Sequence, residues 1–152
     1  MVNKKRDQWA PLLLRLIIGY GFMAHGFVKL SRGTAGFEKL LAQTGVPFSH
    51  MASRVVPFVE LLGGLAILTG VFVNIVAIPL IITMLVALFT VQFKYGFSSV
   101  NTVGLTSNGP LFGPPGYEIN LLYIAGLISL ILSGGGAFSV DPLIHRKKKT
   151  KI

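Results

Sequence analysis

Four apolar runs, each close to 20 residues long, limit what this chain of 152 residues can fold into. They cover about residues 10–30, 55–73, 75–93 and 117–135. A helix needs ~20 residues to cross ~30 Å of hydrocarbon, and in lipid a backbone must satisfy its own hydrogen bonds. The sequence therefore predicts an all-α fold, an integral membrane four-helix bundle that forms a single domain over residues 1–152.

The composition agrees with a membrane setting. Hydrophobic residues make up 52% of the chain and charged residues only 12%, whereas soluble domains carry roughly 25% charged residues. The chain has no cysteine, which excludes disulfides, thiol nucleophiles and cysteine-ligated metals. It also lacks a phosphate-binding or dinucleotide-binding glycine motif, zinc-ligand spacing, and a pair of histidines within the spans. The sequence thus indicates no haem, metal or flavin.

Basic residues cluster at both ends of the chain, which has a formal net charge of +9. Four crossings place both termini on one side, and lysine and arginine favour the cytoplasmic side. We therefore expect both termini to be cytoplasmic, with basic tails at anionic headgroups rather than on nucleic acid. The expected location is a bacterial cytoplasmic (inner) membrane, crossed several times, with a tight cytoplasmic turn around Asn74.

The two remaining connections then face outward. Residues 34–44 carry apolar side chains at helical spacing before Gly45 and Pro47, which predicts a short amphipathic helix at the interface. Residues 96–117 are rich in glycine, serine, asparagine and proline, which predicts a turn-rich loop. We expect its apolar residues Phe97, Leu111 and Phe112 to fold it back over the bundle.

Polar side chains inside the apolar runs are the candidate functional residues. With a rise of ~1.5 Å per residue, His25 and Glu60 each lie roughly 8 Å inside the outer end of their helices. The sequence predicts that polar groups from all four helices gather in the outer third of the bilayer, apart from one near the cytoplasmic end. The candidates are Glu60 and His25 as catalytic groups, and Lys29, Glu118, Arg15 and Gln92 as ligand-binding groups.

Helix periodicity indicates which way these side chains point. At ~100° per residue, one stripe of the first helix holds Arg15, Gly19, Phe22, His25, Gly26 and Lys29. A face of the second helix holds Glu60, Gly63, Gly64 and Ile67. Small residues allow membrane helices to approach closely. The sequence therefore predicts that Glu60 points into the bundle.

An intramembrane acid is costly, and it is usually paired or functional. Paired with Lys29 or His25, Glu60 stays charged, and the cluster can donate hydrogen bonds to a quinone carbonyl and pass protons during quinone reduction. Structural alternatives stay open. The cluster can be a set of polar contacts that only holds the helices together. Lys29 and Arg15 can snorkel to the interfaces. Glu118 can stabilise the start of its helix through the macrodipole.

Several segments resemble the DoxX family of small bacterial membrane proteins over about residues 12–142. They are "LLLRLIIGYGFMAHGFVKL" at 12–30, "TGVPF" at 44–48, "VELLGGLAILTGVF" at 59–72 and "YEINLLYIAGLISLILSGGGAFSVD" at 117–141. Arg15, His25, Lys29, Glu60, Glu118, Ser139 and Asp141 match motif positions of the family, whereas Ala137 stands where a basic or bulkier residue is common.

The resemblance implies a four-helix membrane protein and an oxidoreductase component that works at the quinone pool or in redox and thiol stress. A quinone is then the expected cofactor. Electrons would come from a partner subunit or a soluble redox enzyme, since the chain has no redox motif of its own. Two alternatives remain: a non-catalytic scaffold or chaperone for a redox enzyme, and a small proton-coupled exporter with Glu60 as the proton carrier.

Overall fold

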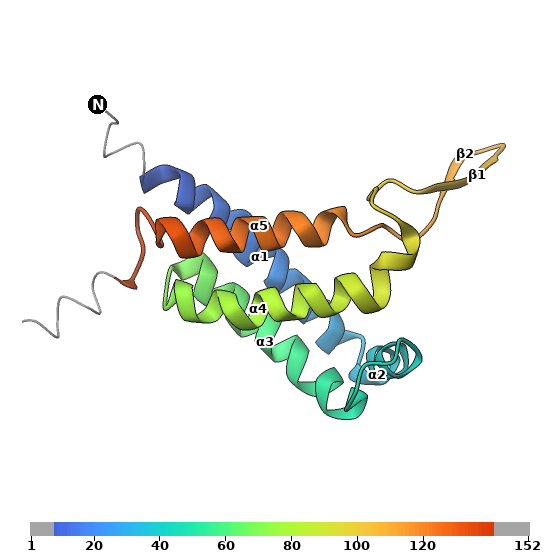
Figure 1. The fold of residues 1–152 in the computed structure, drawn as a ribbon, viewed down its shortest axis with the longest axis horizontal. Helices are drawn as coiled ribbons and strands as arrows, with labels where there is room; N and C mark the ends of the chain where they lie inside the picture. Colours follow the sequence, from blue (N-terminus) through green and yellow to red (C-terminus); the bar gives the residue numbers. More distant parts are fainter. Residues whose placement is uncertain (1–7, 142–152) are drawn as a thin grey trace, which may run out of the picture.

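A computed structural model describes residues 8–141, so the basic clusters near both ends of the chain lie outside the described residues. Four helices pack together as two pairs that diverge toward one end of the bundle (Figure 1). They are α1 (Trp9–Ser31), α3 (Ser49–Thr69), α4 (Val73–Ala87) and α5 (Glu118–Ser133). Helix α4 continues through a π-helical turn, η2 (Leu88–Gln92), and a 3-10 turn, η3 (Phe93–Tyr95).

Three of these helices are long and apolar enough to cross a membrane: Trp9–Ser31, Ser49–Thr69 and the continuous Val73–Tyr95. The fourth, α5, is apolar but has 16 residues, or about 24 Å at ~1.5 Å per residue. The structure thus confirms a mostly helical fold, with three candidate membrane spans and, where the sequence predicted a fourth span, a shorter apolar helix.

The turn between α3 and α4 lies earlier than the sequence predicted. It runs through Gly70, which caps α3 in the left-handed region with φ 73°, and Phe72, which has φ 48°. Asn74 lies inside the first turn of α4, not in the connection. The carboxylate of Asp141 accepts hydrogen bonds from the amides of Phe72 and Val73 at 2.6 and 3.2 Å, and so satisfies donors at the start of α4.

The two other connections differ in outcome. The predicted short helix is confirmed as α2 (Thr34–Gln43), which packs against α3. The predicted turn-rich loop instead contains an antiparallel hairpin of β1 (Thr102–Thr106) and β2 (Gly109–Phe112). A small two-stranded sheet therefore corrects the all-α expectation.

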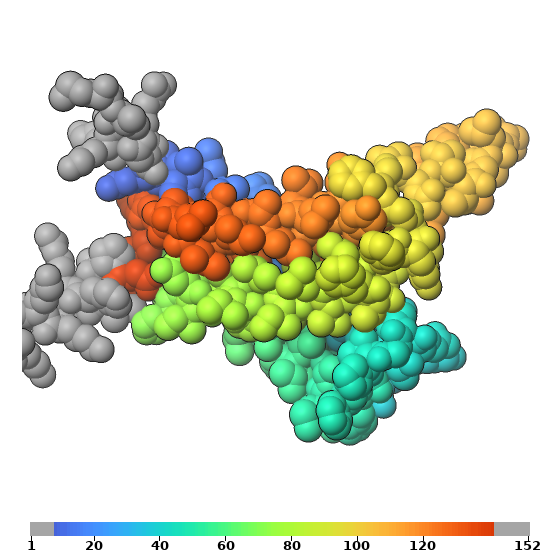
Figure 2. All heavy atoms as spheres, in the orientation of Figure 1, coloured from blue at the N-terminus to red at the C-terminus, as the bar shows by residue number. Residues whose placement is uncertain are grey.

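The hairpin does not fold back over the bundle as expected; it extends away from the helices (Figures 1 and 2). Only the base of the loop is anchored, since the ring of Phe97 packs edge-on against Tyr117 at 5.7 Å. Leu111 and Phe112 stay exposed. The local reason is strand pairing, which satisfies backbone groups within the loop and needs no contact with the helices.

Helices α1 and α3 make the closest contact in the molecule's core, through three glycines. A Cβ added at Gly26 would lie 2.6 Å from the backbone of Pro57 and Leu61. One added at Gly64 would lie 2.7 Å from the carbonyl oxygen of Gly19. Backbones that approach this closely leave no room for a side chain, which is how small residues act at membrane helix contacts.

A substitution test follows from this contact. Gly64→Ala should lower the free energy of unfolding by about 2 kcal/mol, because the new methyl group overpacks a backbone contact that cannot yield without separating the helices. The measurement is thermal or denaturant unfolding of the protein in detergent micelles.

Gly36→Ala is the matched control. Gly36 lies inside α2, and an added Cβ there has no neighbour within 4 Å. Replacing glycine by alanine in a helix interior should therefore raise stability by about 0.5 kcal/mol. Equal destabilisation by both substitutions would contradict the glycine contact.

Candidate functional site

An ion pair between Lys29 and Glu60 joins α1 to α3. The Nζ atom of Lys29 donates to both carboxylate oxygens of Glu60 at 2.5 Å. Glu60 is 2% exposed and Lys29 is 26% exposed. The Nζ atom also lies 4.7 Å from the ring centre of Phe37 on α2. Lys29 therefore does not snorkel to the interface; its charge stays beside a buried carboxylate.

The glycine contact explains why the two charged residues meet. Gly26 lies one helical turn before Lys29, and it touches the α3 backbone at Pro57 and Leu61, on either side of Glu60. Glu60, Gly63, Gly64 and Ile67 are all buried, which confirms the predicted face of this helix. The close approach of the backbones thus brings a carboxylate and an ammonium group within bonding distance.

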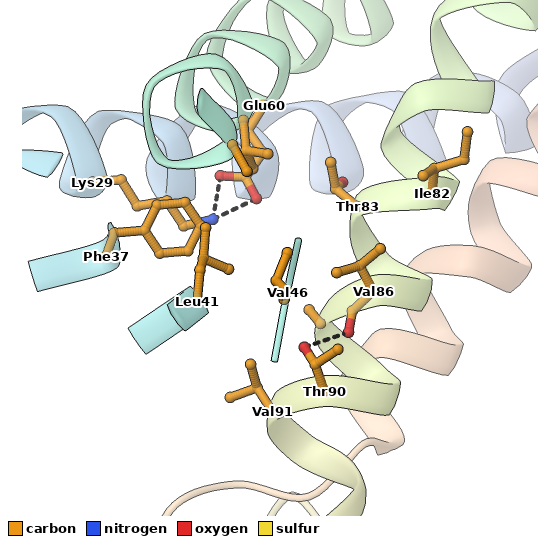
Figure 3. A pocket seen from close by; sticks show the side chains of 13 residues that line it. Lys29, Phe37, Leu41, Val46, Glu60, Ile82, Thr83, Val86, Thr90 and Val91 are labelled. Carbon is orange, nitrogen blue, oxygen red and sulfur yellow. Dashed lines mark hydrogen bonds and ion pairs between the residues drawn. The ribbon is translucent and has the colours of Figure 1, made fainter. Parts of the chain in front are cut away.

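An apolar cavity of about 180 Å³ lies on one side of the ion pair, between α2, α3 and α4 (Figure 3). Figure 3 shows Lys29 and Glu60 at one end of this cavity and Thr90 and Val91, in η2, across from them. We call it the apolar cavity. Its lining consists of Lys29, Phe37, Leu41, Val46, Ala52, Val56, Glu60, Ile82, Thr83, Val86, Ala87, Thr90 and Val91.

A second cavity of about 250 Å³ lies between α1, α4 and α5, and it carries more polar groups. We call it the polar cavity. Lys29 and Glu60 line it as well, together with His25 from α1, Gln92 from η2, and two residues of α5, Asn120 and Tyr123. Its remaining lining residues are Phe37, Leu40, Met84, Ala87, Val91, Pro115, Gly116 and Ile119. Four predicted site residues, His25, Lys29, Glu60 and Gln92, therefore share one cavity.

His25 lies at the edge of this cavity rather than in the buried stripe of α1. Its side chain is exposed, and its ring meets that of Tyr123 edge-on at 6.2 Å between centres. The other predicted stripe members Arg15, Gly19, Phe22 and Gly26 are buried. His25 therefore lies at the exposed margin of the predicted stripe, whose central positions contact α3, and it still lines one cavity with Lys29 and Glu60.

Two amide oxygens at the polar cavity are buried and have no hydrogen-bond partner among the described residues. They are Oε1 of Gln92 and Oδ1 of Asn120. Gln92 is positioned by the π-helical turn η2, a feature that often accompanies functional sites in helices. A buried acceptor without a partner costs about 1–3 kcal/mol, so a donor group bound in this cavity would recover that cost.

Asn120 is a site residue that the sequence reasoning missed. It is 3% exposed, and its Nδ2 atom donates to the carbonyl oxygen of Met84 at 3.4 Å. This hydrogen bond fixes the orientation of the amide, because in the reversed amide Oδ1 of Asn120 would face the carbonyl oxygen of Met84, and both are acceptors. The signal was present in the sequence, as an asparagine in the first turn of an otherwise apolar run.

Two predicted ligand-binding residues lie away from both cavities. Glu118 accepts hydrogen bonds from the amide and hydroxyl of Ser99 at 2.9 and 2.7 Å, and so fixes the base of the loop. Arg15 is 2% exposed and donates to the carbonyl oxygens of Leu68, Gly135 and Ala137. Arg15 therefore does not snorkel; it holds the segment after α5 against the end of α3.

The model of the DoxX family matches residues 10–92. A Bacillus subtilis protein named "Putative oxidoreductase CatD" is 30% identical over 145 residues, which cover 95% of this chain and 94% of the relative. An Escherichia coli protein named "Inner membrane protein YqjF" is 30% identical over 144 residues, covering 95% and 98% respectively. No solved structure matches the chain.

A double-mutant cycle tests whether the ion pair stabilises the fold. Lys29→Met and Glu60→Gln should each lower the unfolding free energy, because each leaves a partner without its counter-charge. The double variant should lose less than the sum of the two, with a coupling of about 1–2 kcal/mol. Thermal unfolding in micelles measures all four proteins. Additive losses would mean that the ion pair contributes nothing to stability.

Proposed function

The chain belongs to the DoxX family, and on that premise we propose that it is a membrane oxidoreductase component that binds a quinone ring beside Lys29 and Glu60. The observation that carries this proposal is the ion pair itself, which lines both cavities. A relative that is named as an oxidoreductase supports the reaction class.

The polar cavity has the groups that a quinone and its reduced form require. Lys29 is a cation with three N–H donors, and it can hydrogen-bond a quinone carbonyl. The unpartnered oxygens of Gln92 and Asn120 accept hydrogen bonds from the hydroxyl groups of the quinol. An apolar cavity of ~150 Å³ holds benzene, so the polar cavity of about 250 Å³ has room for a substituted ring.

Reduction of the ring needs two electrons and two protons for each quinone. In this proposal the electrons come from a partner subunit or a soluble redox enzyme. The protons reach the two ring oxygens through Glu60 and through His25, which lies at the exposed edge of the cavity. Histidine exchanges protons near neutral pH, and it therefore suits the position between solvent and ring.

The proposed setting is a cytoplasmic membrane crossed four times, with both termini on the cytoplasmic side. Three spans of sufficient length, a shorter apolar α5, and a relative named as an inner membrane protein support it. Both cavities then lie toward the outer face, at the end of the bundle that holds α2 and the hairpin (Figure 1). The basic residues near the chain ends favour the same orientation.

A second candidate function is a non-catalytic scaffold for a redox enzyme. The hairpin favours it, because β1 and β2 extend away from the bundle and expose apolar residues such as Leu105 and Phe112. An isolated two-stranded hairpin is marginally stable in water, so a partner protein would stabilise it. Deleting residues 102–112 should abolish partner capture if the chain is a scaffold and leave quinone binding intact.

Quinone binding by the purified protein tests the first proposal. In quinone-free lipid nanodiscs, menadione should bind to the wild type with a measurable dissociation constant. Lys29→Met and Glu60→Gln should each raise that constant about tenfold, which corresponds to about 1.4 kcal/mol of lost binding free energy. Isothermal titration gives the constants.

Lys39→Met is the matched control, because Lys39 is exposed on α2 and the chemical change is the same. It should bind menadione as the wild type does. No binding by the wild type, or wild-type affinity in both ion-pair variants, would overturn the proposal.

A further inference from the structure

We propose that the apolar cavity holds the start of a branched hydrocarbon tail while the quinone ring occupies the polar cavity. The substrate is then a lipid-soluble quinone taken from the bilayer, not a tailless ring taken from water. This inference rests on the proposed function, and it adds which part of the ligand each cavity receives and which residues select for the tail.

The two cavities adjoin each other but differ in chemistry. Five residues line both of them: Lys29, Phe37, Glu60, Ala87 and Val91. Apart from these five shared residues, the polar cavity is lined by a histidine, two amides and a tyrosine. The apolar cavity is lined by aliphatic residues and two threonines. A ligand that fits both must have a polar ring at one end and an apolar group at the other.

The two threonines do not make the apolar cavity polar. The hydroxyl of Thr83 donates to the carbonyl oxygen of Leu80 at 2.8 Å, and that of Thr90 donates to Val86 at 2.8 Å (Figure 3). Both hydroxyls are thus satisfied by their own helix, as is common for threonine within helices. Apart from the ion pair at one end, the cavity therefore offers no free donor that a polar ligand would need.

The apolar cavity opens where a lipid-soluble ligand would arrive. Ile82 is 54% exposed and Val86 is 39% exposed, although both line the cavity. They lie within Val73–Tyr95, the most apolar of the candidate spans. The exposed parts of Ile82 and Val86 therefore give the cavity a rim on the apolar surface of α4. A tail can remain in the bilayer while its first carbons enter the protein.

The size of the cavity limits how much of the tail it holds. An apolar cavity of ~150 Å³ accommodates benzene, which has six carbons. A cavity of about 180 Å³ therefore suits one isoprene unit of five carbons, and the rest of the tail extends into the lipid. Without a tail, the ligand makes no contact with the apolar lining of this cavity.

The test compares two quinones that share a ring: menadione, which has no isoprenoid tail, and a menaquinone with two isoprene units. Val86→Phe narrows the apolar cavity and should weaken binding of the menaquinone at least tenfold while leaving the affinity for menadione unchanged. Each ligand is compared between variants in the same nanodiscs, so that partition into lipid cancels. Leu85→Phe is the matched control: Leu85 is the preceding residue on α4 but does not line either cavity, and it should change neither affinity.

Ala52→Leu narrows the same cavity from α3, with a side chain smaller than the phenylalanine of Val86→Phe. If Val86→Phe does not fold, the affinities of Ala52→Leu for the two quinones are the test. Unchanged menaquinone affinity in the folded variant, or equal weakening of both quinones, would overturn the tail assignment and leave the proposed function standing. If the wild type binds neither quinone, the proposed function itself fails.

Discussion

The contact between α1 and α3 fixes the geometry on which the candidate site depends. Because glycines at the contact leave the backbones almost touching, residues one turn away are held in a fixed register. Lys29 and Glu60 occupy those positions and form an ion pair. In a low-dielectric setting an unpaired carboxylate would be very costly, so the close helix contact is what allows a charged acid to remain there.

The two ends of the bundle use polar groups differently. At one end the terminal nitrogens of Arg15 donate to three carbonyl oxygens, although its Nε atom is buried without a partner among the described residues, and Asp141 accepts from the start of α4. These side chains hold the segment after α5 against the ends of α3 and α4. At the other end the helices diverge, and two buried amide oxygens beside the ion pair have no partner among residues 8–141. The first arrangement gives stability, whereas the second leaves polar groups available to a ligand.

Separation into a polar and an apolar cavity gives the ion pair a further role. It lies between the exposed His25 of the polar cavity and the exposed aliphatic residues of α4 that line the apolar cavity. A charge in this position can orient a ligand that is polar at one end only, because the polar end gains hydrogen bonds there and the apolar end gains burial. Orientation of this kind is what transfer of protons to a quinone ring requires.

By itself, the sequence determined the helices, their apolar character and the face of Glu60, because periodicity and length depend only on local residue order. It also predicted that His25, Lys29, Glu60 and Gln92 gather toward one end of the helices, since the helical rise is constant, and these four residues line one cavity. The tertiary structure decided which of these residues meet. Lys29 pairs with Glu60, Arg15 and Glu118 hydrogen-bond to the segments that connect or follow the helices, and Asn120 lines the polar cavity. Those outcomes require the distances between helices and the register of their contact, which are set by long-range packing and cannot be calculated from the order of residues in one helix.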